Sequence, residues 1–487
     1  MLLLLLSNQV GTGTRTFAKR LLLRPQLTAF DDSSLRSYHA TPKQEILPLV
    51  GAAAILLIAR YSWKALRRMD DEWDEYQWQL QQYEKQHGVV NIEEAKFKGG
   101  TLAVDMGTIN LVFAHKALAS KAAEVIETRE GARYTFCGMG QQDGELGQRA
   151  FEQYFELPPQ QHDASVVSTI QLPYRLLTDD PKSANMIIST VLQSSLIDVL
   201  DRTQTKLGQF RPVVAVPPGV PNETDAYGSV LGDTATAYIP EPVAAIWGAQ
   251  QVKLLPSSVE TRILVVDVGG HVTSLSVVQK NVVLAHTSLP KFGGETFVQE
   301  IMEHVLEEMP NLAHDAYALP RVYQASQAAA AEFNVHTRAN IHIPYIGMDL
   351  KTKQPQHIDM DMSRTVLEQA IQEHVRNIVV PNASRKLSPH MPPPTDLSGL
   401  WTSLLTQILE DAHMTPLQVS HIILVGGGAK QSLVVTSLQS SWMSLTGTID
   451  HMVVPQIGVR SELVALGAAS LLPNYHYDPN RGLVRDS

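Results

Sequence analysis

The sequence LAVDMGTINLVFA, from Leu102 to Ala114, has a counterpart in ILVVDVGGHVTSLSVV, from Ile263 to Val278. In each stretch an apolar run reaches an aspartate, passes through a turn that contains glycine, and returns as a second apolar run. Apolar and β-branched residues bounded by such turns predict buried strands. The chain is therefore expected to form the same strand-turn-strand hairpin twice.

The turns of these hairpins have the chemistry of a phosphate site. Glycine lets the backbone turn tightly with its N–H groups exposed, which makes a small nest for an anion. An aspartate at the strand end can hold a hydrated Mg²⁺ beside the phosphates. One such hairpin is weak evidence, because a glycine turn after a buried strand is usually only a turn. Two copies followed by IILVGGGAKQSLV from Ile422, a strand that runs into three glycines and a helix, are a strong signal.

From Thr101 to about Pro473 the sequence alternates strand and helix patterns, which is typical of an α/β protein. The wide spacing of the two hairpins favours two related lobes over a short-period repeat. The predicted strands are Leu102–Asp105, Asn110–Ala114, Val213–Val216, Ile263–Asp267, Ser274–Val278, Asn340–Ile343 and His421–Val425. The predicted helices are Ala184–Thr203, Glu295–Glu308, Thr365–Val379, Leu397–Ala412, Gln431–Leu445 and Arg460–Leu472.

Composition excludes several classes of function. The chain is 44% apolar and 18% charged, as expected for a globular protein with a core. Its single cysteine, Cys137, excludes an internal disulfide framework and a cysteine-rich metal site. Residues 1–68 hold ten basic and three acidic side chains, whereas the whole chain has a net charge of -10. The acidic body gives no electrostatic reason to bind nucleic acid.

The N-terminal residues have the pattern of a targeting sequence. Residues 1–30 contain no acidic residue, and FAKRLLLR at 17–24 can form a basic amphipathic helix. RSYHA at 36–40 resembles the processing sites of mitochondrial presequences, so a presequence is predicted over 1–40. A secretory signal is the alternative, although the apolar run Leu2–Leu6 is short for one and its basic residues follow rather than precede it.

A single transmembrane anchor is predicted within residues 45–66. A helix over Ile46–Ile58 would extend only about 20 Å, but one over Ile46–Trp63 extends about 27 Å, close to the ~30 Å hydrocarbon core. The alternative is a helix packed on the globular body. Basic residues after the apolar run favour the matrix for that side, whereas stop-transfer sorting would reverse it. The predicted location is the mitochondrial inner membrane, with a secretory-pathway membrane as the alternative, and 67–98 is predicted to be a helical linker.

These motifs together resemble the nucleotide-binding domain of the heat shock protein 70 family, in the actin-like ATPase superfamily. VDMGTIN and VVDVGG resemble the two phosphate loops of the family, and ILVGGGAK resembles its adenosine-side LVGGSTR. Further resemblances in the same order are VVAVPPGVPN at 213–222, IPEPVAAIWGA at 239–249, FGGETF at 292–297 and LVALGAAS at 463–470.

The resemblance implies a two-lobed actin-like ATPase fold, made of duplicated ribonuclease-H-like lobes, over residues 99–473. Lobe I would hold about 99–260 and 455–473, lobe II about 261–454, and 474–487 would be a tail. The resemblance also implies ATP or ADP with Mg²⁺ as ligand, Asp105 and Asp267 as metal ligands through water, and Glu241 and Asp267 as catalytic carboxylates. The nucleotide-binding residues that it implies are Asp105, Gly107, Thr108, Asn110, Gly269, Gly270, Gly293, Gly294, Glu295, Gly426, Gly427, Gly428 and Lys430.

Several positions depart from the family pattern where side chains do chemistry. Ile109 replaces a threonine that would touch a phosphate. Phe151 stands at the position of a lysine that orients the attacking water, and the loss of such a group costs about 10²-fold or more in rate. Arg149 could substitute for it, but is expected to point elsewhere. In the second loop His271 and Val272 replace glycine and threonine, and His271 either donates a hydrogen bond to phosphate or plugs the site.

The purine side departs further. The family clamps the purine between lysine and arginine stems, and alanines cannot do so by stacking or cation–π contact. Ser461 stands where the family has an aspartate near the base. The positions that correspond to the family's purine-binding helix hold Gln327, Ala330, Ala331 and Asn334.

Three functions follow from these observations. The preferred one is an ATP-binding, chaperone-related protein with weak or lost hydrolysis, expected to lack a peptide-binding domain because only Pro473–Ser487 follows the closing helix. If it is an enzyme, it is an ATP hydrolase of low turnover. The second is a pseudo-ATPase scaffold that binds protein partners and no longer uses nucleotide. A sugar kinase or another actin-like relative is the third.

Overall fold

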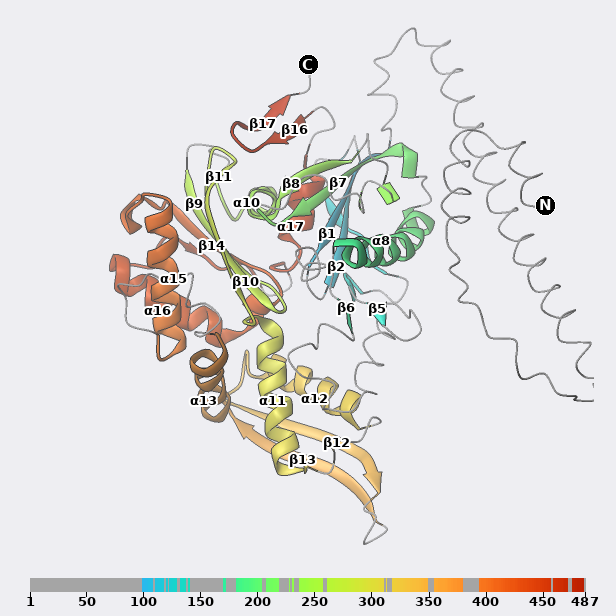
Figure 1. The fold of residues 1–487 in the computed structure, drawn as a ribbon, viewed down its shortest axis with the longest axis vertical. Coiled ribbons are helices and arrows are strands. Elements are labelled where there is room, and N and C mark those ends of the chain that lie inside the picture. Colours follow the sequence, from blue (N-terminus) through green and yellow to red (C-terminus); the bar gives the residue numbers. More distant parts are fainter. Residues whose placement is uncertain are drawn as a thin grey trace, which may run out of the picture. The chain divides into compact units, whose positions relative to one another are not determined.

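The computed structural model describes most of the chain from residue 99 onward (Figure 1). The chain divides into two compact units, Met1–Gly88 and Val89–Ser487, and all described residues belong to the second. The described residues are 99–107, 110–117, 120, 122–128, 132–136, 139–140, 170–171, 181–203, 207–218, 227, 230–231, 236–256, 261–310, 312, 318–348, 354–379, 394–456, 459–471 and 475–485.

Several predicted features lie outside this part of the chain. They are the presequence over 1–40, the anchor at Ile46–Trp63, the linker over 67–98, and the side chains of Thr108, Ile109, Cys137, Arg149 and Phe151. Within the described residues, no helix combines the length and the apolar character that a membrane crossing needs.

The first sheet forms around the hairpin of β1 (Gly100–Met106) and β2 (Asn110–Lys116). Its strand order is β3-β2-β1-β7-β8, with β4 paired to β2. β1 runs antiparallel to β2 and parallel to β7. The helix α8 (Pro181–Thr203) packs on one face through Ile188 and Leu192. The remaining strands are β3 (Glu124–Val125), β4 (Thr135–Phe136), β7 (Phe210–Val216) and β8 (Ala237–Pro240).

The second sheet repeats this plan. Its order is β11-β10-β9-β14-β15, and β9 runs antiparallel to β10 and parallel to β14. The position of β9 therefore corresponds to that of β1, and β14 to β7. The repetition fits the actin-like ATPase fold that the family resemblance implies. The strands are β9 (Arg262–Val268), β10 (Val272–Gln279), β11 (Val282–Pro290), β14 (His421–Val425) and β15 (Met452–Val453).

Two helices lie between the two sheets (Figure 1), and they share one apolar core with both. These are α10 (Glu241–Gln251) and α17 (Leu463–Ala469). They approach so closely that a Cβ on Gly467 would lie 1.7 Å from the Ala244 carbonyl oxygen, and one on Gly248 would lie 2.0 Å from that of Leu463. Glycine is needed at this crossing because backbone meets backbone there.

The outer part of the second half surrounds the buried side chain of Trp401 and a large apolar core. A two-stranded ribbon, β12 (Arg338–Met348) with β13 (Pro355–Ser363), packs on α12. The helices here are α11 (Gly294–Glu308), α12 (Leu319–Glu332), α13 (Arg364–His374) with its π-helical continuation Val375–Val379, α15 (Leu397–Asp411) and α16 (Ser432–Thr446). The short remaining elements are the pair β5 (Met139–Gly140) and β6 (Ile170–Gln171), and 3-10 turns at Leu207–Gln209, Pro416–Gln418 and Gly428–Lys430.

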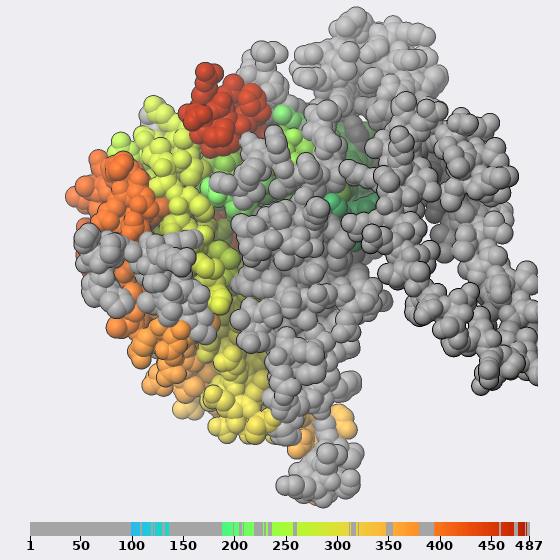
Figure 2. Space-filling model, viewed as in Figure 1, coloured from blue at the N-terminus to red at the C-terminus, as the bar shows by residue number. Residues whose placement is uncertain are grey.

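The segment predicted as a tail contains a β-hairpin, β16 (Tyr475–Asp478) with β17 (Gly482–Arg485). Tyr477 packs against the core shared by the two sheets, and a Cβ on Gly482 would lie 2.7 Å from the Lys280 carbonyl oxygen. Figures 1 and 2 show this hairpin in red beside the β10–β11 turn. The end of the chain is therefore part of the packed body.

One predicted helix is shorter than expected. Arg460–Leu472 was the predicted range, whereas α17 begins at Leu463. The guanidinium of Arg460 donates to the carbonyl oxygens of Pro455 and Ala429, which holds the preceding residues in turns. Side-chain bonds to a distant loop have overridden the local helical pattern.

Candidate functional site

Three acidic residues lie where β1, β8 and β9 end: Asp105 and Asp267 near the ends of β1 and β9, and Glu241 directly after β8. Side chains alternate along a strand, so Asp105 continues the row begun by Ala103 in β1, and Asp267 continues that of Val265 in β9. Ala103 and Val265 both belong to the core around α10 and α17. Glu241 is the first residue of α10, directly after β8. Alternation and topology thus bring the three carboxylates to one place.

The three carboxylates perturb each other strongly. Burial, and secondly the charge of Asp267, raise the pKa of Asp105 to about 8. Burial raises the pKa of Asp267 to about 6. Burial and the charges of Asp105 and Asp267 hold the pKa of Glu241 well above its ordinary value. Each side chain keeps partial solvent contact. The cluster therefore resists its own ionisation and would gain from a cation.

The carboxylates suit a hydrated metal better than a direct cage. Across the described residues, no group of three His, Cys, Asp or Glu side chains is placed to hold a metal ion. Mg²⁺ is a hard cation that keeps several of its waters and needs few protein oxygens. Asp105 and Asp267 fit that requirement, and their assignment as ligands through water stays a prediction.

The two hairpin turns are closed in the same way. The Gly107 N–H donates to the Asn110 carbonyl at 2.9 Å, and the Gly269 N–H donates to the Val272 carbonyl at 2.9 Å. A Cβ on either glycine would lie about as close to that same carbonyl, at 3.0 Å and 2.9 Å. The repeat seen in the sequence is thus a repeat of backbone geometry.

The start of α11 is hydrogen-bonded to the second turn. The N–H groups of Gly294 and Glu295 donate to the carbonyls of Gly269 and Gly270, each at 2.9 Å. The Gly293 N–H donates to the Thr296 hydroxyl at 3.1 Å. These amides, predicted to contact nucleotide, are already bonded within the protein. In this structure they fix the shape of the loop, and their direct contact with nucleotide stays a prediction.

The three glycines after β14 divide into two kinds. Gly426 has a left-handed φ of +91°, and a Cβ there would lie 2.3 Å from Asp267 Oδ1. A Cβ on Gly428 would lie 2.5 Å from the Gly294 nitrogen. A Cβ on Gly427 would meet no atom within 4 Å. Gly426 and Gly428 are therefore required by packing, whereas Gly427 borders open space beside the second hairpin.

Charged residues surround the far end of this glycine loop. Burial and the charge of Arg460 lower the pKa of Lys430, while Glu462 opposes that shift. Glu462 is buried and accepts from Arg133 at 2.8 Å. Sequence reasoning named Lys430 but missed Glu462, because an acidic residue one position after Ser461 carries no signal until the loop is folded beside it.

The residues that the family resemblance assigns to the purine clamp make internal contacts. Ala330 is 2% exposed and belongs to the core. The amide of Gln327 donates to the Tyr323 hydroxyl at 2.9 Å. The Asn334 side-chain oxygen accepts the Ser432 N–H at 3.0 Å, at the start of α16. These three side chains are used for packing and bonding within α12 and its neighbours.

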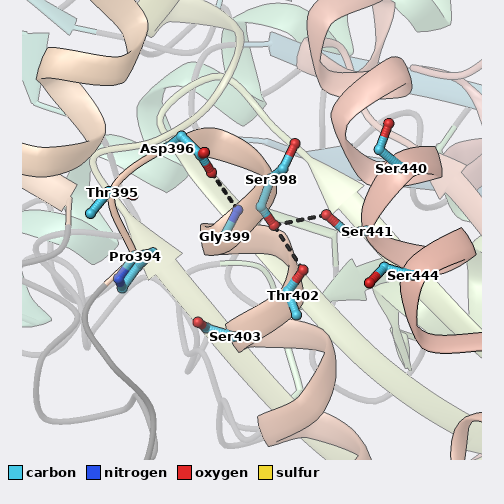
Figure 3. Close-up of a pocket in the computed structure, with 10 residues that line it drawn as sticks. All are labelled: Pro394, Thr395, Asp396, Ser398, Gly399, Thr402, Ser403, Ser440, Ser441 and Ser444. Carbon is cyan, nitrogen blue, oxygen red and sulfur yellow. Dashed lines mark hydrogen bonds between the residues drawn. The ribbon is translucent and has the colours of Figure 1, made fainter.

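A separate cavity of about 410 Å³ lies between α15 and α16 (Figure 3). Its lining is rich in hydroxyl groups, but those of Thr402 and Ser441 donate to the Ser398 carbonyl, and Asp396 accepts the Gly399 N–H at 2.6 Å. None of the residues known to line it is basic. The cavity therefore has no evident means of neutralising a polyphosphate.

Comparison with known proteins agrees with the geometry. The family model described as Hsp70 protein matches residues 240–387, which include Glu241, Asp267 and the second hairpin. The chaperone protein DnaK of Thermotoga petrophila is 25% identical over 357 residues, which is 70% of this chain and 55% of that protein. DnaK proteins of Thermotoga maritima and Thermotoga neapolitana match to the same extent.

The chain spans about half the length of the curated relatives it matches. The family-model match and these relatives support the assignment of the chain to the Hsp70 family, in the actin-like ATPase superfamily.

Proposed function

We propose that this protein binds ATP or ADP with Mg²⁺ between its two hairpins. One observation carries the proposal: two turns closed by the same hydrogen bond lie at the ends of strands whose aspartates, Asp105 and Asp267, interact electrostatically with each other and with Glu241. A cluster of acids that resist ionisation favours a divalent cation, and a cation beside glycine turns favours phosphate.

Each part of the site has a role in this proposal. Asp105 and Asp267 hold the water shell of the metal ion, and Glu241 orients that shell. Gly427 borders the space that the nucleotide occupies, and the partly buried cation of Lys430 attracts its negative charge. Hydrolysis is weak or lost, because Phe151 occupies the position of the family's lysine and a phenyl ring cannot stabilise the developing charge.

The biological setting is also part of the proposal. The matched relatives are named chaperone proteins, which supports a chaperone-related role with protein partners. The basic presequence pattern over 1–40 and the apolar segment Ile46–Trp63 support an anchor in the mitochondrial inner membrane, with a secretory-pathway membrane as the alternative.

Calorimetry on the full-length protein tests the proposal. We expect weak but saturable Mg-ATP binding, with turnover far below that of an intact chaperone ATPase. Gly270→Glu should abolish binding, because a carboxylate would enter the phosphate turn. Val335→Glu adds the same charge at a side chain that is 75% exposed, and it should leave binding unchanged. If Gly270→Glu binds as well as the wild type, the phosphate site is wrong.

A pseudo-ATPase scaffold is the second candidate. It is favoured by Ala330, Gln327 and Asn334, whose side chains are used within the protein rather than on a purine. Absence of Mg-ATP and Mg-ADP binding by the folded wild type, together with co-purification of a stoichiometric protein partner, would support this function instead.

A further inference from the structure

His374, the last residue of α13, lies between two acceptors. Its Nδ1 is 2.7 Å from Glu300 Oε1 on α11, and its Nε2 is 3.0 Å from the carbonyl oxygen of Lys291. The side chains of His374 and Glu300 are only 9% and 13% exposed. The imidazole therefore bridges α13, α11 and the turn that precedes α11.

Both partners of this ring are acceptors, a carboxylate oxygen and a carbonyl oxygen. A neutral imidazole carries one N–H and can satisfy only one of them, whereas an imidazolium donates to both. Burial opposes the charge, but the bonds to Glu300 and Lys291 and the charges of Glu300 and Glu303 outweigh it and raise the pKa of His374. The two acceptors therefore suit the protonated ring.

The carbonyl that His374 holds belongs to an unusual residue. Lys291 has a left-handed φ of 61°, a conformation that residues other than glycine adopt only when their surroundings hold it. Directly after it, the Phe292 N–H donates to the His271 carbonyl at 3.1 Å, and the Gly294 N–H donates to that of Gly269. Lys291 thus begins the segment that supports the second phosphate turn.

We propose that protonated His374 is a positioning residue for the second phosphate turn, which it fixes through the Lys291 carbonyl. The predicted effect of His374 on nucleotide binding rests on the proposed function above, whereas its predicted effect on the structure of the turn does not. A neutral His374 keeps its one N–H on the carboxylate of Glu300, the stronger acceptor, so loss of the proton breaks the bond from Nε2 to the Lys291 carbonyl. We therefore expect deprotonation to loosen the Lys291–Glu295 segment.

The charged groups that act on His374 are Glu300 and Glu303 of α11, and Glu307 acts in turn on Glu303. On the element of His374 itself, Glu373 precedes it and Arg376 follows, the latter donating to the Thr395 carbonyl at 3.4 Å.

Both hydrogen bonds of His374 should be fully formed below the ordinary histidine pKa of 6.5. The bond to Lys291 should be lost as pH rises through the raised pKa of His374. Asp105 and Asp267 also titrate between about 6 and 8, and they affect cation binding in the opposite direction. The decisive comparison is therefore between variants rather than the wild type alone.

Amide hydrogen exchange on the full-length protein, expressed as protection factors, tests the proposal without any nucleotide. In the wild type, protection of the Phe292, Gly294 and Glu295 amides should fall about tenfold between pH 6 and pH 9, the effect of one charge-assisted hydrogen bond. His342→Gln, at a ring that is 57% exposed, should keep the wild-type pH dependence.

Two variants separate positioning from simple packing. Gln places its amide near the position of Nε2, so His374→Gln should keep the Lys291 bond and stay protected at both pH values. Asn places its amide near Nδ1, so His374→Asn should be unprotected at both. Equal behaviour of the two variants, or a wild type whose protection does not change with pH, would overturn the proposal.

Nucleotide binding adds a second readout. Mg-ADP should bind His374→Asn several-fold more weakly than it binds the wild type at pH 6, and the difference should vanish at pH 9. If the wild type binds no nucleotide at any pH, the proposed function fails, while the exchange experiment still decides the role of His374.

Discussion

The phosphate side of the candidate site is formed mainly by backbone atoms, whereas the purine side would have to be formed by side chains. Apart from its carboxylates, the phosphate side consists of backbone: paired turns, the start of α11, and glycines at which a Cβ would overlap other backbone atoms, such as Gly428 beside Gly294. The purine side of the family consists of long side chains, and here those positions hold Ala330 and Ala331.

This difference shows which features of a site a fold protects. A glycine packed against backbone cannot change without disturbing the sheets, so the phosphate turns persist with the fold itself. A side chain that only contacts a ligand can be lost with little effect on folding. The packed backbone of the phosphate side is therefore the better guide to ancestry, and the side chains that would contact a ligand are the better guide to present activity.

The largest expected effect breaks the phosphate side. In Gly428→Ala the new methyl group would lie 2.5 Å from the Gly294 nitrogen and 2.6 Å from the Gly269 carbonyl oxygen. We expect the free energy of unfolding, measured by chemical denaturation, to fall by about 3 kcal/mol. Gly427→Ala is the matched control, because its methyl group meets nothing within 4 Å and its backbone is right-handed helical. Equal losses in both variants would refute the packing described here.

A medium effect concerns the carboxylates. The pKa of Asp105 is raised to about 8 in the folded state from 3.8, so the folded protein holds a proton that the unfolded chain releases. The stabilisation that this bound proton gives to the folded state is complete below about pH 4 and is lost as pH rises toward about 8. Asparagine does not titrate, so Asp105→Asn does not lose stability in this way. The melting temperature of Asp105→Asn minus that of the wild type, measured in EDTA, should therefore increase from pH 5 to pH 8.

The exposed Asp450 provides the control for that comparison, because Asp450→Asn should show no such gain. A difference between Asp105→Asn and the wild type that stays constant with pH would mean that Asp105 is not an acid of raised pKa.

The smallest effect sharpens the purine side. Ala331 is exposed on α12, and Ala331→Arg would restore one cationic stem. We expect calorimetry to show Mg-ATP binding about fivefold tighter, as for a cation–π contact at an exposed site, with no gain for Mg-tripolyphosphate. Ala330→Arg should instead destabilise the protein, because that position is buried. An equal gain for tripolyphosphate would indicate simple charge attraction rather than a purine contact.

The sequence predicted both hairpins because their apolar runs and glycine turns are local patterns. It missed β13, whose sequence PQHIDMDMS places acids and a histidine on its exposed side and so lacks an apolar run. It extended α17 to Arg460, because the bonds that turn this segment reach Pro455 and Ala429. It named most glycines of the site but not His374, whose partners on α11 and at Lys291 are distant in sequence.

The sequence by itself determined the repeated hairpins, the acids at their ends and the alanines at positions that the family resemblance assigns to the purine clamp. These depend on residue identity and on short-range backbone preference, which are written along the chain. Only the tertiary structure decided which amides are already bonded, which glycine faces open space, and how far Asp105, Glu241 and Asp267 resist ionisation. Those properties depend on burial and on neighbours from distant elements, and they exist only once the two sheets have packed around α10 and α17.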